Sequence, residues 1–295
     1  MPVPPELLKQ VKGLALRTRG VVDSLFSGEF RSVFRGQGME FAEVRAYEAG
    51  DDFRAIDWNV SARLGAPFVK TFTEERELTL LLVVDQSAST RVGVPVTKAA
   101  RMVEIAAVLA LAGAREQDRV GGILFSDRIE HVIPPAKGRR HALRLLRDLL
   151  AFASSRRGTN LVQAVHYASN VLKHRSVVVL LSDFLAEGWD KALRELAARH
   201  QVIAITVDDP REETPPPAGW LTLEDAENGR RALVNTGSAR ARGRWLAAVR
   251  ERRTRRAERL RAAGAEHIAL DLTSDYGLVL RRAFSRRRRR STRRR

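Results

Sequence analysis

Residues 78–89 read Leu-Thr-Leu-Leu-Leu-Val-Val-Asp-Gln-Ser-Ala-Ser, an apolar run that ends abruptly in polar residues. Positions 80–84 are apolar at odd and even places alike, which is typical of a central strand covered by helices on both faces. A second run, Val177 to Leu181, has the same character and leads into Ser182-Asp183. The two runs predict two buried strands of a parallel sheet, each followed by an aspartate.

Outward from these runs, short β-branched stretches alternate with longer amphipathic patterns, which predicts an α/β fold with a mostly parallel sheet and helices on both faces. The predicted strands are 78–84, 119–125, 176–182, 201–207 and 266–271. The predicted helices are 6–26, 96–115, 138–152, 160–173, 188–199 and 238–263. We also expect an antiparallel edge strand at 128–133, a hairpin at 220–235 turning at Asn228-Gly229, and irregular chain at the proline-rich 208–219.

The patterns divide the chain into three parts. Residues 1–75 read as an N-terminal extension in which a helix is followed by a mixed, charged segment. Residues 76–284 hold the alternating strands and helices. Residues 285–295 are an Arg-rich tail with no core-forming residue, which we expect to be disordered.

The positive charge is concentrated in two segments. The chain has 295 residues and a net charge of +17. Residues 240–261 and 281–295 contain ten Arg each and carry net charges of +8 and +10, so the rest of the chain sums to −1. The main body is therefore not the basic surface that a duplex-wrapping protein needs. The Arg segments alone allow nonspecific contact with nucleic acid or anionic lipid.

Several classes of protein are excluded or disfavoured. The chain has no Cys, which excludes disulfide frameworks, thiolate metal sites and thiol nucleophiles, and agrees with a cytoplasmic location. We find no apolar run long enough to span a membrane and no export signal. The phosphate-binding loop of P-loop ATPases and the Gly-x-Ser-x-Gly elbow of serine hydrolases are also missing.

Oxygen-bearing side chains follow the predicted strands. Asp85, Ser87 and Ser89 alternate after the first run, Thr159 precedes the predicted helix 160–173, and Asp183 follows the third central strand. Ligands of open parallel sheets bind beyond the carboxyl ends of the strands, so three loops bring these five donors to one edge. Such hard donors suit Mg²⁺, Mn²⁺ or Ca²⁺. The alternative is that these residues only cap helices, but capping does not require this combination on three loops.

This set of residues resembles the metal-ion-dependent adhesion site of von Willebrand factor A domains, in which Asp-x-Ser-x-Ser, a Thr and an Asp occur in this order. All five positions match. The resemblance implies a von Willebrand factor A-like fold and an octahedral ion, usually Mg²⁺, with one position left for a carboxylate of a partner protein. Because the site has only two carboxylates of its own, a bound ion would still attract such a group.

The upstream segment narrows the resemblance. It contains Gly50-Asp51-Asp52-x-Arg54-x-Ile56-Asp57-Trp58, and the chain continues later with Asp209-Pro210-Arg211-Glu212. On these motifs, over about residues 7–284, the chain resembles the domain of unknown function 58 family of bacteria and archaea. The resemblance implies partnership with a MoxR-type AAA+ ATPase and no established enzymatic activity. The Gly50–Trp58 block itself is either a second site or a salt-bridged structural element.

These observations lead to one main expectation, a non-enzymatic, metal-dependent interaction module that serves as an adaptor of a MoxR-type AAA+ ATPase acting on a client protein. The alternative is a nucleic-acid- or anionic-membrane-associated protein that acts through the Arg-rich helix and tail. A metal-dependent hydrolase ranks last, because we find no His or Glu next to the site loops that could serve as a base.

Overall fold

A computed structural model of the protein describes residues 4–26, 39–74, 78–152, 154 and 156–292. The chain forms two compact units, one made of residues 1–34 and 79–295 and the other of residues 35–78. The segment that we expected to form a single extension, residues 1–75, is thus divided between the two units.

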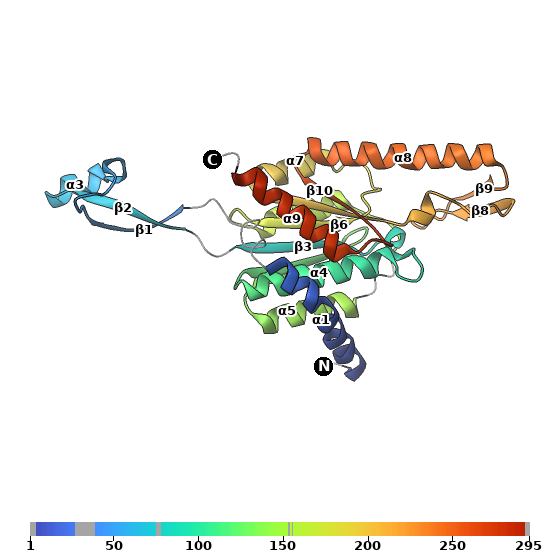
Figure 1. Ribbon diagram of the computed structural model, residues 1–295, viewed down its shortest axis with the longest axis horizontal. Coiled ribbons are helices and arrows are strands. Elements are labelled where there is room, and N and C mark those ends of the chain that lie inside the picture. Colours follow the sequence, from blue (N-terminus) through green and yellow to red (C-terminus); the bar gives the residue numbers. More distant parts are fainter. Residues whose placement is uncertain (1–3, 27–38, 75–77, 153, 155, 293–295) are drawn as a thin grey trace. The chain divides into compact units, whose positions relative to one another are not determined.

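The larger unit is built on a central sheet that has six strands within the described residues (Figure 1). In spatial order these are β10 (Glu266–Asp271), β7 (Gln201–Asp208), β6 (Val177–Ser182), β3 (Thr79–Asp85), β4 (Arg119–Phe125) and β5 (Ile129–Ala136). All neighbours are parallel except β4 and β5, which are antiparallel. The predicted α/β class, the parallel strands and the antiparallel edge strand are all confirmed.

Helices cover both faces of this sheet. One face carries α4 (Lys98–Arg115) and α5 (Arg139–Ala151), and the other carries α6 (Leu161–Val171), α7 (Asp190–Arg199) and the long α8 (Ala239–Ala262) (Figure 1). The strands between them are apolar on both sides, and every residue of β6 is buried. Burial of apolar surface between these layers is the main stabilising contribution to the fold.

Helix α1 (Pro5–Phe26) packs against α4, α5 and the C-terminal helix α9 (Tyr276–Thr292). Its buried residues, Val11, Leu14, Thr18 and Val22, recur every three or four positions. This spacing places them on one face of a helix of 3.6 residues per turn. The apolar face of the amphipathic helix predicted for residues 6–26 is therefore buried against helices that come much later in the chain.

The smaller unit, residues 35–78, is a β-hairpin with short helices between its strands. Strands β1 (Met39–Ala46) and β2 (Phe68–Glu74) are antiparallel, and η1 (Phe53–Ala55) and α3 (Trp58–Leu64) lie between them in sequence. Three large apolar side chains of this unit, Phe53, Trp58 and Leu64, are exposed. We did not predict these elements, because the segment alternates too irregularly to indicate strands.

The C-terminal third contains the predicted hairpin and a helix that we did not expect. Strands β8 (Trp220–Glu224) and β9 (Arg231–Asn235) pair as predicted, after the short turn η3 (Pro210–Glu212). Helix α9 (Tyr276–Thr292) follows β10. The predicted disorder of 285–295 is therefore wrong as far as Thr292. Buried Leu280 and Phe284 anchor α9, and Arg, a good helix former, extends a helix that already exists. In the described part of the chain, no helix is both long and apolar enough to cross a membrane.

Candidate functional site

Strands β3 and β6 lie side by side where the strand order of the sheet changes direction. This is the edge at which open α/β sheets bind their ligands. Val84 pairs with Leu181 in the parallel register, so Asp85 and Ser182 are the next neighbours. The hydroxyl of Ser182 donates a hydrogen bond of 2.5 Å to Oδ2 of Asp85. The carboxylate of Asp85 is thus held in place by Ser182, the last residue of β6, and Asp183 follows directly after it.

The loop after β3 gathers three of the predicted donors. Asp85, Ser87 and Ser89 are all buried. The backbone N–H of Ser87 donates to Oδ1 of Asp85 at 2.9 Å, and the hydroxyl oxygens of the two serines are 3.1 Å apart. The loop continues into η2 (Ala88–Arg91), where the Thr90 hydroxyl donates to the Ser87 carbonyl at 2.8 Å. Alternate spacing in a tight loop therefore brings these oxygens together as expected.

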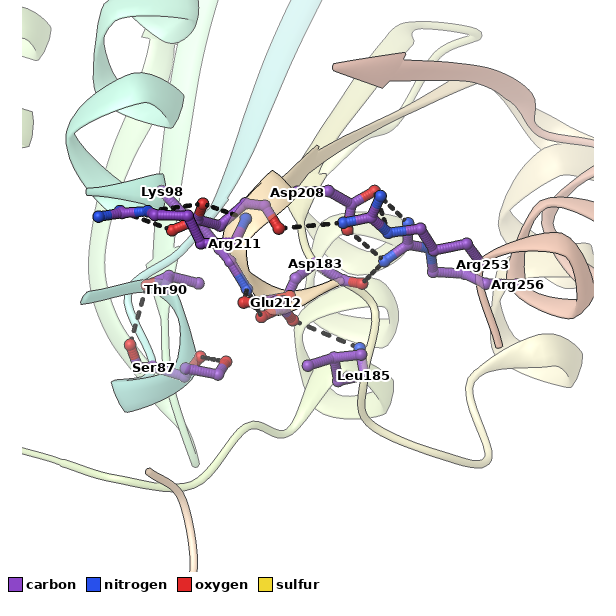
Figure 2. Close-up of polar contacts among 12 residues, drawn as sticks. Ser87, Thr90, Lys98, Asp183, Leu185, Asp208, Arg211, Glu212, Arg253 and Arg256 are labelled. Carbon is purple, nitrogen blue, oxygen red and sulfur yellow. Dashed lines mark hydrogen bonds and ion pairs between the residues drawn. The ribbon is translucent and has the colours of Figure 1, made fainter. Parts of the chain in front are cut away.

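Asp183 directly follows β6 and has an exposed fraction of 1%. Its Oδ1 accepts a hydrogen bond of 3.3 Å from the backbone N–H of Leu185, and its Oδ2 lies 3.5 Å from Nζ of Lys98 (Figure 2). Lys98 begins α4, is equally buried, and also forms an ion pair with Glu212 of η3. Sequence reasoning missed both residues. Glu212 belongs to the Asp209–Glu212 motif, whereas a single Lys at a helix start carries no signal.

The charges of this group are unbalanced. The ammonium of Lys98 pairs with two carboxylates, those of Asp183 and Glu212, and a third carboxyl, that of Asp85, has Asp183 as its charged neighbour. Burial and the neighbouring Asp183 carboxylate raise the pKa of Asp85, hydrogen bonds from two serines oppose them, and the net pKa is about 7. Burial lowers the pKa of Lys98, but the neighbouring carboxylates outweigh burial and the net shift is upward. A cation next to both aspartates would relieve their repulsion.

The donors present fit a hard divalent cation. Oδ2 of Asp183 is buried and accepts no hydrogen bond from any described residue. The same residues include no cluster of three or more His, Asp or Glu side chains suited to a metal. A cation at this edge would therefore be held by the two aspartates together with serine hydroxyls. Mg²⁺, Mn²⁺ and Ca²⁺ accept such all-oxygen sets, usually with water completing the coordination.

Thr159 lies in the loop before α6, next to the loop that follows β3. The two loops are joined by a hydrogen bond of 3.0 Å from the N–H of Ala88 to the carbonyl of Arg157. The Thr159 hydroxyl, however, donates at 2.5 Å to Oε1 of Glu227, in the β8–β9 turn. Across the described residues, no hydrogen bond joins Thr159 to the other four predicted donors. We found no Glu near these loops in the sequence, and that expectation is wrong for both Glu212 and Glu227.

A second buried ion pair adjoins Asp183. Arg256 of α8 donates to both carboxylate oxygens of Asp208, at 3.0 and 2.5 Å, and to the backbone carbonyl of Asp183 at 2.6 Å (Figure 2). Its exposed fraction is only 6%, so the expectation of a basic outer side on this helix fails at this position. A guanidinium can be buried here because a bidentate carboxylate compensates its charge.

The Gly50–Trp58 block lies in the smaller unit. Arg45 donates to both oxygens of Asp51 at 2.8 and 2.6 Å and lowers the pKa of that carboxyl. Asp57 caps α3 and lies 3.1 Å from Nζ of Lys70, which lowers its pKa. Asp52 caps η1. Because each acid of the block has a local partner, the structural reading is favoured over a second site.

The family model described as "Protein of unknown function DUF58" matches residues 43–255. The chain belongs to the DUF58 family. Relatives of this DUF58 protein include uncharacterized proteins of Mycobacterium tuberculosis and Mycobacterium bovis, each 33% identical over 229 residues, which are 76% of this chain and 72% of the relative. A third, from Mycobacterium avium, is 31% identical over 147 residues, 49% of this chain and 86% of the relative.

Solved structures similar to this DUF58 protein include two from Bacteroides. The conserved hypothetical protein BatB from Bacteroides thetaiotaomicron is 14% identical, with a TM-score of 0.47. An aerotolerance-related membrane protein from Bacteroides fragilis is 16% identical, with a TM-score of 0.48. Each comparison covers 72% of this chain and 99% of the other. The sheet described above, parallel with one antiparallel edge strand, is that of a von Willebrand factor A-like fold.

Proposed function

We propose that this DUF58 protein is a non-enzymatic protein-interaction module that binds a divalent cation. The cation is Mg²⁺, or Mn²⁺ or Ca²⁺ in its place. Its ligands come from Asp85, Ser87, Ser89 and Asp183, and Thr159 joins them when its hydroxyl is released from Glu227. The observation that carries this proposal is the pair of buried aspartates at the strand-order switch, for which the described residues provide one ion pair, that of Asp183 with Lys98. An Asp or Glu of a partner protein completes the coordination, because two protein carboxylates leave a divalent ion attractive to a third.

The proposed partner is a MoxR-type AAA+ ATPase, for which this protein serves as an adaptor toward a client. This part of the proposal rests on the family to which the chain belongs. The chemistry of the site agrees with an adaptor role. If a carboxylate of the partner completes the coordination of the cation, one acidic side chain of the partner determines whether it is recognised.

Two observations favour binding over catalysis and over a polyanion-binding role. Both glutamates near the site are engaged, Glu212 by Lys98 and Glu227 by Thr159, so neither is a free base for activating water. Several arginines of α8 are likewise used within the molecule, including Arg253 and Arg256. The charge of that helix is therefore less available to a polyanion than its sequence indicates.

Thermal unfolding with added Mg²⁺, Mn²⁺ or Ca²⁺ tests the cation site. A cation at 100 times its Kd stabilises the native state by about 2.7 kcal/mol, which corresponds to roughly 5–10 °C in Tm for a chain of this size. We expect this shift in the wild type and not in Asp85→Asn. The control is Asp148→Asn, which removes a carboxylate of α5 that is paired with Arg147. Equal shifts in wild type and Asp85→Asn, or no shift of the wild type with any of the three ions, would contradict the proposal.

The partner is tested by capture of the MoxR-type ATPase from the same organism on immobilised protein, with Mg²⁺ or with EDTA. We expect capture only with Mg²⁺ and only by the wild type and Asp148→Asn. Capture that is insensitive both to EDTA and to Asp85→Asn would rule out a cation-mediated contact.

A further inference from the structure

A groove runs between the loop after β6 and helix α8. Its volume is about 310 Å³. The loop side is formed by Phe184, Leu185, Ala186 and Glu187, and the helix side by Ala248, Glu251, Arg252, Arg255, Arg256 and Arg259. An apolar floor thus lies next to a row of guanidinium groups. The helix residues recur every three or four positions, so one face of α8 supplies the whole row.

The guanidinium groups differ in how far the protein itself satisfies them. Arg259 is engaged by Asp190 at 2.8 and 2.5 Å and stacks on the Trp189 ring at 4.7 Å. Among the described residues, Arg255 has one ion-pair partner, the exposed Glu251 one turn away on the same helix. Arg252 is exposed and forms no ion pair with any described residue. Positive charge is therefore left over along the helix side of the groove.

Arg256 is a fixed part of the groove wall. Its side chain is more than nine-tenths buried, and its guanidinium donates to both carboxylate oxygens of Asp208 and to the carbonyl of Asp183. Its Nε, which is itself buried, has no hydrogen-bond partner among the described residues. The three bonds hold this guanidinium in place beside the exposed Arg252 and Arg255.

Two residues that line the groove also contact Asp183 of the cation site. Leu185, on its floor, donates its backbone N–H to Oδ1 of Asp183, and Arg256, on its wall, donates to the carbonyl of the same residue (Figure 2). A partner chain that places one carboxylate at the cation therefore passes this groove with the residues next to that carboxylate.

We propose that the groove binds an acidic, extended peptide segment of the partner protein, with its acids against Arg252 and Arg255 and an apolar side chain on the floor formed by Leu185. This inference rests on the proposed function, which places a carboxylate of the partner at the cation. It adds the chemical character of the partner segment next to that carboxylate. A peptide suits the groove better than nucleic acid does. Two of the lining residues, Glu187 and Glu251, repel a continuous phosphate backbone, whereas a peptide can place neutral residues next to them.

The test measures binding of a fluorescein-labelled peptide that repeats Glu-Glu-Leu-Gly, by fluorescence anisotropy in low salt. The full chain is used as wild type, as Arg252→Glu/Arg255→Glu, and as Arg240→Glu/Arg244→Glu. The last pair makes the same change of charge on exposed positions of α8 that do not line the groove. We expect the groove variant to bind at least tenfold more weakly and the control variant to change by less than threefold, with all proteins unfolding at similar temperatures.

Equal weakening by the two variants would overturn the proposal, because it would indicate general attraction to a basic helix. So would a labelled single-stranded DNA of the same charge that binds as tightly as the peptide and is weakened by the same groove variant. Repeating the titration with EDTA and with Asp85→Asn separates this inference from the proposed function. Peptide binding that persists while Asp85→Asn shows the same Tm shift as the wild type would contradict only the cation site. If the cation site is intact but the groove variant binds the peptide as tightly as the wild type, only the groove proposal is contradicted.

Discussion

Replacing Lys98 by Met removes the ammonium that pairs with Asp183 and leaves an uncharged side chain of similar length. Both side chains are 1% exposed and their charged atoms are 3.5 Å apart. At an effective dielectric constant of about 20, two unit charges at this distance attract each other by about 5 kcal/mol. Part of this attraction is offset by the cost of removing both groups from water. Breaking a buried pair on one side typically costs about 3–5 kcal/mol, and we expect Lys98→Met to lower the free energy of unfolding by that amount.

The partner variant Asp183→Asn and the double variant complete a thermodynamic cycle measured by urea denaturation at pH 7. Because the double variant leaves no unpaired charge in this pair, we expect it to be more stable than the sum of the single changes predicts, with a coupling of about 2–3 kcal/mol. The slope of unfolding against urea should stay constant, since no large surface is exposed in the folded variants. A coupling below about 0.5 kcal/mol would refute the conclusion that this ammonium balances this carboxylate. Partners of Lys98 other than Asp183 would then hold it in place.

Three further results are expected. Because the pKa of Asp85 is raised to about 7, protons compete with a cation for this carboxylate. The Mn²⁺ affinity measured by calorimetry should therefore fall about tenfold for each pH unit below about 7. An affinity that does not depend on pH would place the cation elsewhere. Burial and two neighbouring arginines lower the pKa of His267 to about 4, so its protonation favours the unfolded chain. In urea titrations the free energy of unfolding should be about 2.5 kcal/mol lower at pH 4.5 than at pH 7 because of this residue. In His267→Gln the drop between the two pH values should be smaller than in the wild type by the same amount. Gly121→Ala should destabilise the protein by at least about 1 kcal/mol, because the new Cβ on β4 would lie 2.9 Å from a backbone carbonyl oxygen. Gly243→Ala should stabilise it by about 0.5–1 kcal/mol, because a Cβ at this position of α8 meets no atom within 4 Å. Equal changes of Tm in the two variants would contradict this prediction.

The sequence was informative wherever burial is strong and local. The run at 80–84 and the run at 177–181 are apolar at every position, so their strands and the aspartates that end them follow from the pattern alone. The same reasoning placed Asp85, Ser87 and Asp183 at one edge of the sheet, because parallel strands that start together also end together. The role of these residues in cation binding stays a prediction.

What sequence reasoning missed depends on contacts between distant segments. The bond from Thr159 to Glu227 joins residues 68 positions apart, and no local pattern reports which glutamate of a hairpin turn reaches which loop. Arg256 is one of ten arginines in a basic stretch, and only the position of Asp208 in the fold distinguishes it from its exposed neighbours. Helix α9 was missed because its anchoring residues are few and its arginines resemble a disordered tail.

The packing of α1 has a consequence for the protein while it is being made. This helix is synthesised first, but α4 and α5, which cover its apolar face, end only at residues 115 and 151. At typical rates of translation, that face waits on the order of ten seconds for its partners. Strands β1 and β2, which pair with each other, are both synthesised within this interval. During this interval the nascent chain therefore carries an unpaired amphipathic helix, whose apolar stripe a chaperone or the surface of the ribosome can bind.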